Sequence, residues 1–263
     1  MKIVKNNYHT HTNRCFHATG RDEEYVLAAI EAGFDEIGFA DHSPWKFDSD
    51  FVSNMRMHVS ELDDYCNSIK SLREKYKDKI SIKLGLECEY FKKYLPWLKE
   101  IIDQQEIDYV ILGHHYCDDE KFGIYNGFLN DPDSIFRYRD DLIEAMETGL
   151  FSYIAHPDLF MRGYDRFDEH CKKVSEDIIT AAIRTGTPLE YNLLGIKHGR
   201  NEGKVGYPHP EFWKILAEYK PKVLVGIDAH APSDYLEEDH IALGYNTLSS
   251  LGLTPVDGIK FLR

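Results

Sequence analysis

The chain has 263 residues, of which 43% are hydrophobic and 29% charged, and its formal net charge is −14. This length and composition are typical of a globular protein with a full-sized core. The acidic charge argues against nucleic acid and anionic membranes as partners, because their phosphate groups attract basic surfaces. A small phosphorylated ligand is compatible with this charge, since bound divalent cations can reverse the local field.

The cysteines and the N-terminus indicate a cytoplasmic location. The five cysteines are odd in number and include no C-x-x-C pair, which argues against a disulfide framework and favours a reducing compartment. The opening segment MKIVKNNYHTH lacks the apolar core of a signal peptide, and no stretch is long and apolar enough to span a bilayer. We therefore expect one cytoplasmic domain over residues 1–263.

Strand-like and helix-like segments alternate along the whole chain. Runs rich in apolar and β-branched residues predict strands at residues 3–9, 36–41, 80–88, 109–113, 152–155, 188–192 and 222–227. Amphipathic periodicity predicts helices at residues 22–32, 57–76, 92–104, 133–148, 172–185, 209–219 and 239–249. This alternation favours parallel strands joined by right-handed crossovers.

The number of strands favours a barrel. Seven strands without a break in composition predict an α/β fold whose sheet is closed or nearly closed. A doubly wound open sheet is the alternative, and it usually carries a Gly-rich phosphate loop after its first strand. No such loop follows residues 3–9. The long connections at residues 43–57 and 114–131 follow strands, so in a barrel they would lie on the catalytic face.

Residues with metal-binding side chains recur where these strands end. Imidazole and carboxylate together suit zinc, iron or manganese, and a cluster with open coordination positions suits hydrolysis. In a barrel the carboxyl ends of all strands meet at one rim, which would bring these side chains together. The residues are His9, His11, Asp41, His42, Glu87, His114, His156, Asp228 and His230.

Each of these residues has an ordinary interpretation when taken alone. His9 and His11 share one face of a strand, but a chance H-x-H pair at the surface is common. A single histidine after an apolar strand is more often a core residue with its hydrogen bonds satisfied than a metal ligand. Glu87 and Glu89 face inward together if either does, and a buried carboxylate needs a partner or a metal. Recurrence on strand after strand favours the metal interpretation.

The order of these motifs resembles the polymerase-and-histidinol-phosphatase (PHP) superfamily over nearly the whole chain. The segments Asp41-His42-Ser43-Pro44 and Leu84-Gly85-Leu86-Glu87, and the total length, look most like its histidinol-phosphatase branch. The resemblance implies a distorted (β/α)7 TIM-like barrel. It also implies hydrolysis of L-histidinol phosphate, a small phosphomonoester, by a metal-activated hydroxide at a trinuclear site.

The resemblance further implies three divalent ions, which would be zinc, manganese or iron. The first ion would take His9, His11, Glu87 and Asp228. The second would share Glu87 and take His114 and His156. The third would take His17, His42 and His230. In the loop that carries His17, Cys15 is the competing candidate, and we interpret Cys15 as a small buried residue.

Other residues are candidates for proton transfer and substrate binding. Asp158, or His198 together with Asp41, could protonate the leaving alcohol. Arg162 and Arg200 follow the fifth and sixth strands and could bind phosphate through guanidinium forks, with Ser43 adding a hydroxyl. The amine and imidazole of the substrate would need carboxylates or aromatic faces, and candidates for this are Glu89, Tyr116, Asp48 and Trp45.

Several alternatives stay open at this point. A PHP-type enzyme could act on another small phosphomonoester or on nucleotides and nucleic acid, although the acidic charge argues against nucleic acid. An amidohydrolase also begins with H-x-H, but it commonly bridges its metals with a lysine where this chain has Glu87. A metal-storage protein would need closed ligand shells. The native metal and the oligomeric state are not determined by the sequence.

Overall fold

The computed structural model describes residues 5–164 and 166–263, and within them parallel strands form the centre of the molecule. Four strands lie side by side in the order β1-β2-β3-β4, and β5 pairs with β6. Their bounds are β1 (Asn6–Asn7), β2 (Glu36–Phe39), β3 (Ser81–Cys88), β4 (Tyr109–Leu112), β5 (Leu189–Asn192) and β6 (Val223–Gly226).

Two short contacts close these strands into a ring. Ile154 bridges Leu112 of β4 and Leu189 of β5, so the predicted strand 152–155 lies in its expected place but pairs through one residue only. Thr10 bridges Ala229, which joins the chain after β1 to the chain after β6. The predicted distorted (β/α)7 barrel is therefore confirmed. Of the first predicted strand, residues 3 and 4 lie outside the described residues.

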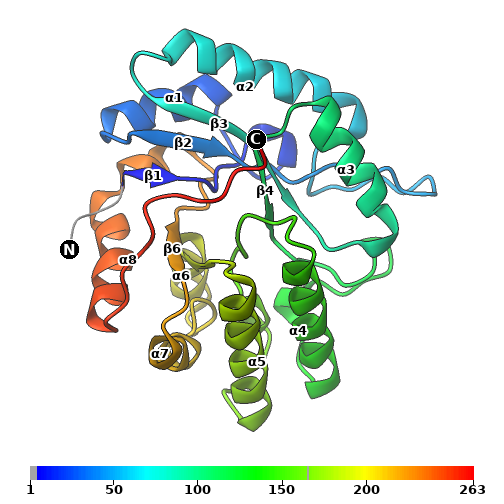
Figure 1. The fold of residues 1–263 in the computed structure, drawn as a ribbon, viewed down its shortest axis with the longest axis vertical. Coiled ribbons are helices and arrows are strands. Elements are labelled where there is room, and N and C mark those ends of the chain that lie inside the picture. Colours follow the sequence, from blue (N-terminus) through cyan, green and yellow to red (C-terminus); the bar gives the residue numbers. More distant parts are fainter. Residues whose placement is uncertain (1–4, 165) are drawn as a thin grey trace.

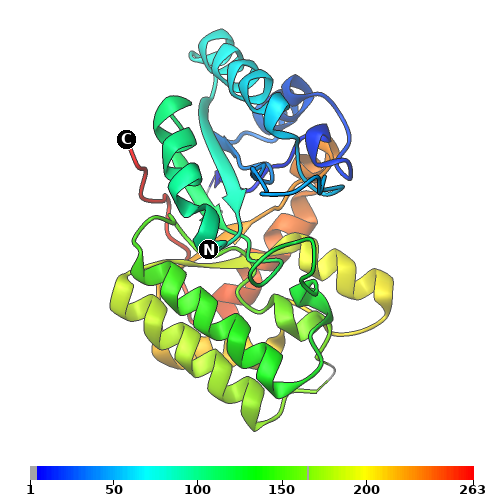
Figure 2. The ribbon, with the colours of Figure 1, turned by 90° about the vertical axis from the view of Figure 1, so that its right-hand side faces the viewer.

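Helices cover the outside of the ring (Figure 1). Two of them, α4 and α5, run side by side, and α1 and α2 pack together elsewhere on the ring (Figures 1 and 2). The bounds are α1 (Asp22–Glu31), α2 (Leu62–Tyr76), α3 (Leu95–Gln104), α4 (Pro132–Glu147), α5 (Glu169–Thr185), α6 (Leu193–Glu202), α7 (Pro210–Tyr219) and α8 (Glu238–Ser250). The first residues of the predicted helices 57–76 and 92–104 include the 3-10 turns Val59–Glu61 and Lys92–Tyr94.

The helix α6 was not predicted. Its sequence LLGIKHGRNE contains two glycines and a polar second half, so its apolar periodicity is weak. Its ends supply the missing stabilisation. The side chain of Asn192 accepts a hydrogen bond from the backbone of Gly195, and Gly203 ends the helix in the left-handed conformation with φ 67°.

The interior of the ring is apolar at its amino end. A small cluster there contains Tyr8, Ala40, Tyr109, Ile111, Tyr153, Ala155 and Leu224. Val256, Ile259 and Phe261 of the C-terminal segment pack against it, and the same segment hydrogen-bonds through the Leu262 backbone to Asp108, just before β4. The ring of Tyr109 occupies the space above Gly38 and Gly85, where any Cβ would overlap it. The amino end of the barrel is thus filled, and polar side chains gather at the carboxyl end.

No helix within residues 5–164 and 166–263 combines the length and apolarity that crossing a membrane requires.

Candidate metal centre

Four side chains from three separate strands meet at the carboxyl end of the ring. His9 and His11 follow β1, Glu87 lies in β3 and Asp228 follows β6. The Nε2 atoms of His9 and His11 lie 3.3 and 3.2 Å from Oδ1 of Asp228, and each lies 3.4 Å from an oxygen of Glu87. Nitrogen and oxygen ligands of one tetrahedral zinc ion are spaced by about 3.3 Å. The four side chains therefore have the spacing of a single ligand shell.

A second group shares Glu87 but differs from the prediction in one residue. Oε1 of Glu87 lies 3.0 Å from Nε2 of His156 and 3.7 Å from Nε2 of His115. The structure thus places His115 in this group and turns His114 away, toward Asp141 on α4. Strand alternation gives the reason. Tyr109 and Ile111 point into the barrel, so positions 113 and 115 follow them inward.

Gly113 is necessary for this arrangement, because a Cβ at that position would overlap the Glu87 carboxylate.

The third predicted group is also brought together. Ligand atoms of His17, His42 and His230 all lie within 4.8 Å of one another. The rings of His11 and His230 are stacked with centroids 4.1 Å apart, and Nδ1 of His42 lies 2.9 Å from Oε2 of Glu87. The groups are therefore contiguous, with His17 at the exposed side.

Oxygen atoms hold the Nδ1 side of most of these rings. An imidazole that donates through Nδ1 presents the Nε2 lone pair to a metal. These Nδ1 contacts join His9 to Glu190 at 2.8 Å, His115 to Glu89 at 3.0 Å, His11 to Asp41 at 3.4 Å, His17 to the carbonyl of Cys15 at 2.6 Å, and His230 to the carbonyl of Asp228 at 3.0 Å.

Glu190 and Asn192 were not predicted to belong to the site. Glu190 is fully buried in β5, and its second oxygen accepts hydrogen bonds from the His156 backbone at 3.0 Å and from Asn192 at 2.8 Å. Asn192 also donates to Oδ2 of Asp228 at 3.0 Å. The available signal was a carboxylate and an amide two residues apart on a predicted barrel strand, which share one face.

The charges at the site favour ligand forms that bind cations. Burial acts to raise the pKa of Glu87, but the imidazoles of His115, His42 and His9 hold it well below its usual value. Burial also acts to raise the pKa of Asp228, but His9 and His11 outweigh this effect, so the pKa of Asp228 is well below its usual value. Both carboxylates are therefore ionised, as metal ligands must be.

The histidines respond to the same charges. Burial, followed by the repulsion of His11, lowers the pKa of His230 to about 3. Burial also acts to lower the pKa of His9, but the charges of Asp228, Glu190 and Glu87 raise it well above its usual value. Carboxylates concentrated in this way around buried imidazoles favour a cation between them.

Unpaired polar atoms provide the test of whether the site fits metal ions. Nε2 of His9, Nε2 of His11, Oε2 of Glu87 and Oδ1 of Asp228 are buried and have no hydrogen-bond partner. Such atoms are costly unless something else satisfies them. His156 and Asp228 also adopt left-handed backbone conformations, with φ values of 30° and 54°, which are uncommon for residues other than glycine and are often found at functional sites. The residues present therefore fit a cluster of divalent metal ions.

Aromatic and basic side chains form one wall beside the centre. The ring of Tyr125 stacks on His115 at 5.9 Å. The guanidinium of Arg162 lies 6.0 Å from the Tyr125 ring and pairs with Glu202 at 2.5 Å. The predicted phosphate ligand Arg162 is thus half-buried next to a ring that contacts the centre.

His198 lies on the same wall, on the helix that was not predicted. Its ring is 6.5 Å from that of Tyr207, which in turn is 5.8 Å from His156. Burial, followed by the charge of Arg162, lowers the pKa of His198. Among the predicted proton donors, His198 is the one that the structure places beside the centre with a partly exposed ring.

The other two predicted proton donors have structural partners. Asp41 binds the backbone and hydroxyl of Thr12 and supports His11. Asp158 is fully buried and accepts a hydrogen bond of 2.6 Å from the backbone of His209. Burial raises the pKa of Asp158 to about 7.

Several predicted substrate contacts also face elsewhere. Glu89 forms a buried ion pair of 2.9 Å with Arg56 and supports His115, so its oxygens are engaged. The buried Ser43 hydroxyl donates to the carbonyl of Pro44 at 3.0 Å. Arg200 is exposed and lines a surface hollow with the acidic residues Glu237, Glu238 and Asp239.

The aromatic and acidic candidates of the long loops lie apart from the rings of the centre. Tyr116 packs edge-on against Tyr125 at 5.8 Å, and so belongs to the outer part of the wall. Trp45 is buried against Phe91. Asp48 is exposed and pairs with Lys93 at 2.6 Å.

Comparisons with known proteins agree with this architecture. The model of the PHP domain family matches residues 7–194. The chain is 28% identical to a protein of Deinococcus radiodurans named probable histidinol-phosphatase, with 86% of each chain covered. It is 23% identical to the histidinol-phosphatase of Bacillus subtilis, with 88% of this chain and 96% of that protein covered.

A solved structure has the same fold. The histidinol phosphate phosphatase of Lactococcus lactis, in complex with zinc, L-histidinol and phosphate, superposes with a TM-score of 0.73 at 21% identity. The match covers 97% of this chain and 96% of that one. The family model matches well over half of the chain, and the fold and the histidine cluster agree with it. The chain therefore belongs to the PHP domain family.

Proposed function

We propose that this protein is a histidinol-phosphatase, a metal-dependent phosphomonoesterase that hydrolyses L-histidinol phosphate to L-histidinol and phosphate in histidine biosynthesis. The observation that carries the proposal is the convergence of buried imidazoles and carboxylates, with unpaired ligand atoms, at the carboxyl end of a PHP-family barrel. Curated relatives that match most of the chain carry this activity in their names.

The ligand groups support three divalent ions, with zinc, manganese or iron as candidates. His9, His11, Glu87 and Asp228 would hold the first ion, Glu87, His115 and His156 the second, and His17, His42 and His230 the third. When bound, such ions lower the pKa of water and offset the charge of a phosphoryl group. The Lactococcus lactis structure contains zinc, which supports zinc as the first metal to test.

The residues of the chain divide the remaining work between orientation and binding. Glu190, Asp41 and Glu89 fix three imidazoles through their Nδ1 atoms. Arg162 is the phosphate ligand, because its guanidinium lies beside the Tyr125 ring that covers His115. Its pairing with the half-exposed Glu202 is exchangeable for a phosphate, which offers the same bidentate geometry.

His198 is the residue assigned to protonate the leaving alcohol. It is the predicted donor with a partly exposed ring on the wall of the centre. Asp41 is buried and bound to Thr12, and Asp158 is fully buried, with Oδ2 bound to the backbone of His209 and Oδ1 without a partner. A histidine is suited to proton transfer, because its ordinary pKa lies near neutrality, and the lowered pKa of His198 makes its protonated ring a stronger acid.

The five cysteines are free, which supports a reducing cytoplasm as the location.

The test is a kinetic panel with metal-loaded protein. L-histidinol phosphate, other small phosphomonoesters, a dinucleotide and a bis-aryl phosphodiester are compared by kcat/KM. We expect L-histidinol phosphate to lead, because a terminal phosphate dianion can use both the metal charge and Arg162. Faster turnover of the dinucleotide or diester would move the protein to the phosphodiesterases of the same family. Faster turnover of another monoester would keep the reaction and change the substrate.

A further inference from the structure

A second group of metal-ligand side chains lies outside the centre described above. His114 and Cys117 belong to the long loop after β4, and Asp141 lies in the middle of α4. Nε2 of His114 is 3.3 Å from Oδ2 of Asp141 and 3.6 Å from Sγ of Cys117. The thiol also interacts with the Asp141 carboxylate, so all three groups are mutual neighbours.

These distances match a shared metal ion better than a pair of hydrogen bonds. Charge-assisted hydrogen bonds between nitrogen and a carboxylate are about 2.7–2.9 Å long, shorter than the contact between His114 and Asp141. Ordinary zinc bond lengths in tetrahedral geometry place nitrogen about 3.3 Å from oxygen and about 3.6 Å from sulfur. Both values agree with the observed contacts.

A buried atom without a partner points to the same missing cation. His114 is 1% exposed and Asp141 is 8% exposed. Oδ2 of Asp141, the oxygen that faces Nε2 of His114, is buried and has no hydrogen-bond partner.

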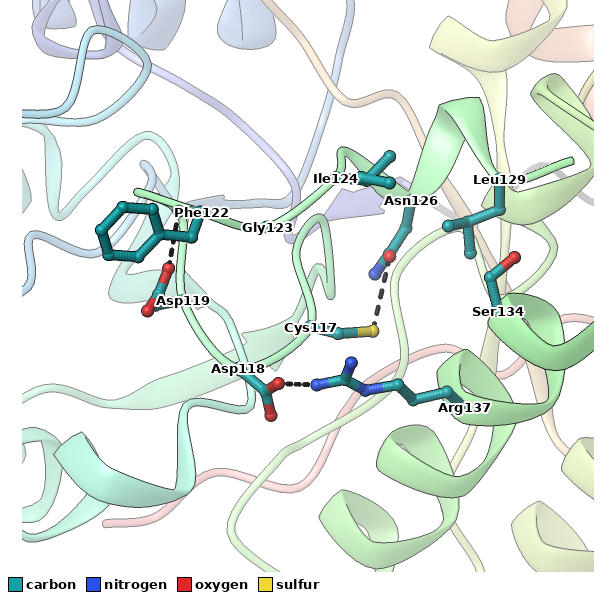
Figure 3. Close-up of a pocket in the computed structure, with 10 residues that line it drawn as sticks. All are labelled: Cys117, Asp118, Asp119, Phe122, Gly123, Ile124, Asn126, Leu129, Ser134 and Arg137. Atoms are coloured by element: carbon teal, nitrogen blue, oxygen red, sulfur yellow. Dashed lines mark hydrogen bonds and ion pairs between the residues drawn. The ribbon is translucent and has the colours of Figure 1, made fainter. Parts of the chain in front are cut away.

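The thiol also faces a cavity that can supply water. Cys117 lines a cavity of about 300 Å³ between the loop and the start of α4, together with Asn126, Ser134 and Arg137 (Figure 3). Sγ of Cys117 lies 3.5 Å from Oδ1 of Asn126 at the edge of this space. A fourth coordination position can therefore be filled by water.

We propose that His114, Cys117 and Asp141 bind a separate divalent ion, zinc by ligand type, that fastens the loop after β4 to α4. Thiolate, imidazole and carboxylate together select zinc among the common divalent metals. The role follows from the connections of the site. Asn126 donates a hydrogen bond of 3.0 Å to the carbonyl of His114, and the next residue, His115, contacts Glu87. The ion would therefore fix the segment that positions His115.

The test uses cobalt as a spectroscopic probe. The full-length protein is stripped with a chelator and reloaded with Co²⁺, and bound metal and the thiolate-to-cobalt absorption band are measured. Wild type should show the band. Cys117→Ser and Asp141→Asn should each lose one equivalent of metal relative to wild type, and Cys117→Ser should lose the band. Circular dichroism confirms that each variant is folded.

Two other cysteines provide matched controls. Cys66 is a buried thiol whose pKa burial raises to about 12, so Cys66→Ser should keep both the band and the metal content. Cys15 lies near ligand atoms of His11 and His230, so it is the competing source of a band. The proposal is overturned if wild type lacks the band, if Cys15→Ser removes it while Cys117→Ser keeps it, or if Cys117→Ser or Asp141→Asn retains all the metal of wild type.

Because the comparison is between variant and wild type, its outcome does not depend on the number of ions in the main centre or on activity.

Discussion

The two ends of the barrel use the same strands for opposite purposes. At the amino end, Tyr8, Tyr109 and Tyr153 fill the interior and Phe261 of the C-terminal segment packs on them. At the carboxyl end, the chain carries His9 and His11 after β1 and Glu87 in β3, and unpaired ligand atoms remain. The comparison shows that the same strands supply both a packed core and a reactive rim, as is usual for α/β barrels.

This division predicts that changes at the rim alter chemistry and changes at the amino end alter stability. The first three substitutions below test this division, from the largest expected effect to the smallest, and the fourth tests the buried carboxyl group of Asp158.

Glu87→Gln should cause the largest loss of activity. The change keeps the shape of the side chain but removes the charge that His9, His42, His115 and His156 share. We expect kcat/KM to fall by an amount that corresponds to more than about 4 kcal/mol of lost transition-state stabilisation, because metal ions stabilise the transition states of such reactions by several kcal/mol. Bound metal, measured by elemental analysis, should also fall. Normal activity with full metal content would remove Glu87 from its proposed role.

Arg162→Ala should weaken catalysis without loss of metal. By analogy with other electrostatic donors, the cost should be about 2–4 kcal/mol in transition-state terms. Arg200→Ala is the matched control, since Arg200 is exposed among the acidic residues of α8. Kinetics with L-histidinol phosphate measure both variants. If Arg162→Ala and Arg200→Ala reduce kcat/KM equally, Arg200 also binds phosphate, as the sequence analysis predicted. Arg200 would then have to move toward the centre when substrate binds.

Phe261→Ala should reduce stability and leave the rim unaffected. The ring lies 5.9 Å from Tyr8 and 6.1 Å from Tyr109, and the ammonium of Lys83 lies 4.9 Å above it. Because Phe261 is only partly buried, we expect about 1–3 kcal/mol less unfolding free energy, below the usual range for a fully buried phenylalanine. Denaturant unfolding gives this value. A loss of metal in the folded variant would show that the two ends are coupled.

Asp158→Asn should change the pH dependence of stability. The pKa of Asp158 is raised to about 7 in the folded protein and is about 3.9 in an unfolded chain. A raised pKa contributes stability that is fully present below about pH 4 and is lost as pH rises to about 7. Asparagine does not ionise, so the variant does not lose this stability. Between pH 4 and pH 7 the unfolding free energy of the variant minus that of wild type should therefore increase, by at most about 1.4 kcal/mol per pH unit. An unchanged difference between pH 4 and 7 would contradict a protonated Asp158.

The pattern of the rim was largely readable from the sequence, and the exceptions have physical causes. The i, i+2 spacing predicted that His9, His11, Asp228 and His230 lie close together, and the structure brings them together, because strand alternation is a local property. Alternation counted from Ile111 would have selected His115, but the pattern of single histidines after strands led to His114. Glu190 stands out in the sequence as a charged residue in an apolar strand. Its contact with His9 could not be predicted, because 181 positions separate the two residues.

The substrate-binding residues were harder to predict. The direction of Arg200 depends on α6, whose two glycines hide its periodicity. The partner of Glu89 is Arg56, a buried residue of the long loop after β2, and only the folded chain brings the two together. Sequence spacing therefore identified most of the side chains that meet at the centre, whereas loop geometry decided which nearby charges face it.

The most direct test of the central claim is anomalous diffraction from crystals of zinc-loaded protein. We expect three anomalous peaks within the metal centre at the carboxyl end of the barrel, one of them bounded by His9, His11, Glu87 and Asp228. The ion proposed between His114, Cys117 and Asp141 would add a separate fourth peak. We expect none at the amino end beside Tyr109 and Phe261. The absence of a peak between His9, His11, Glu87 and Asp228 in fully loaded crystals would contradict the central claim.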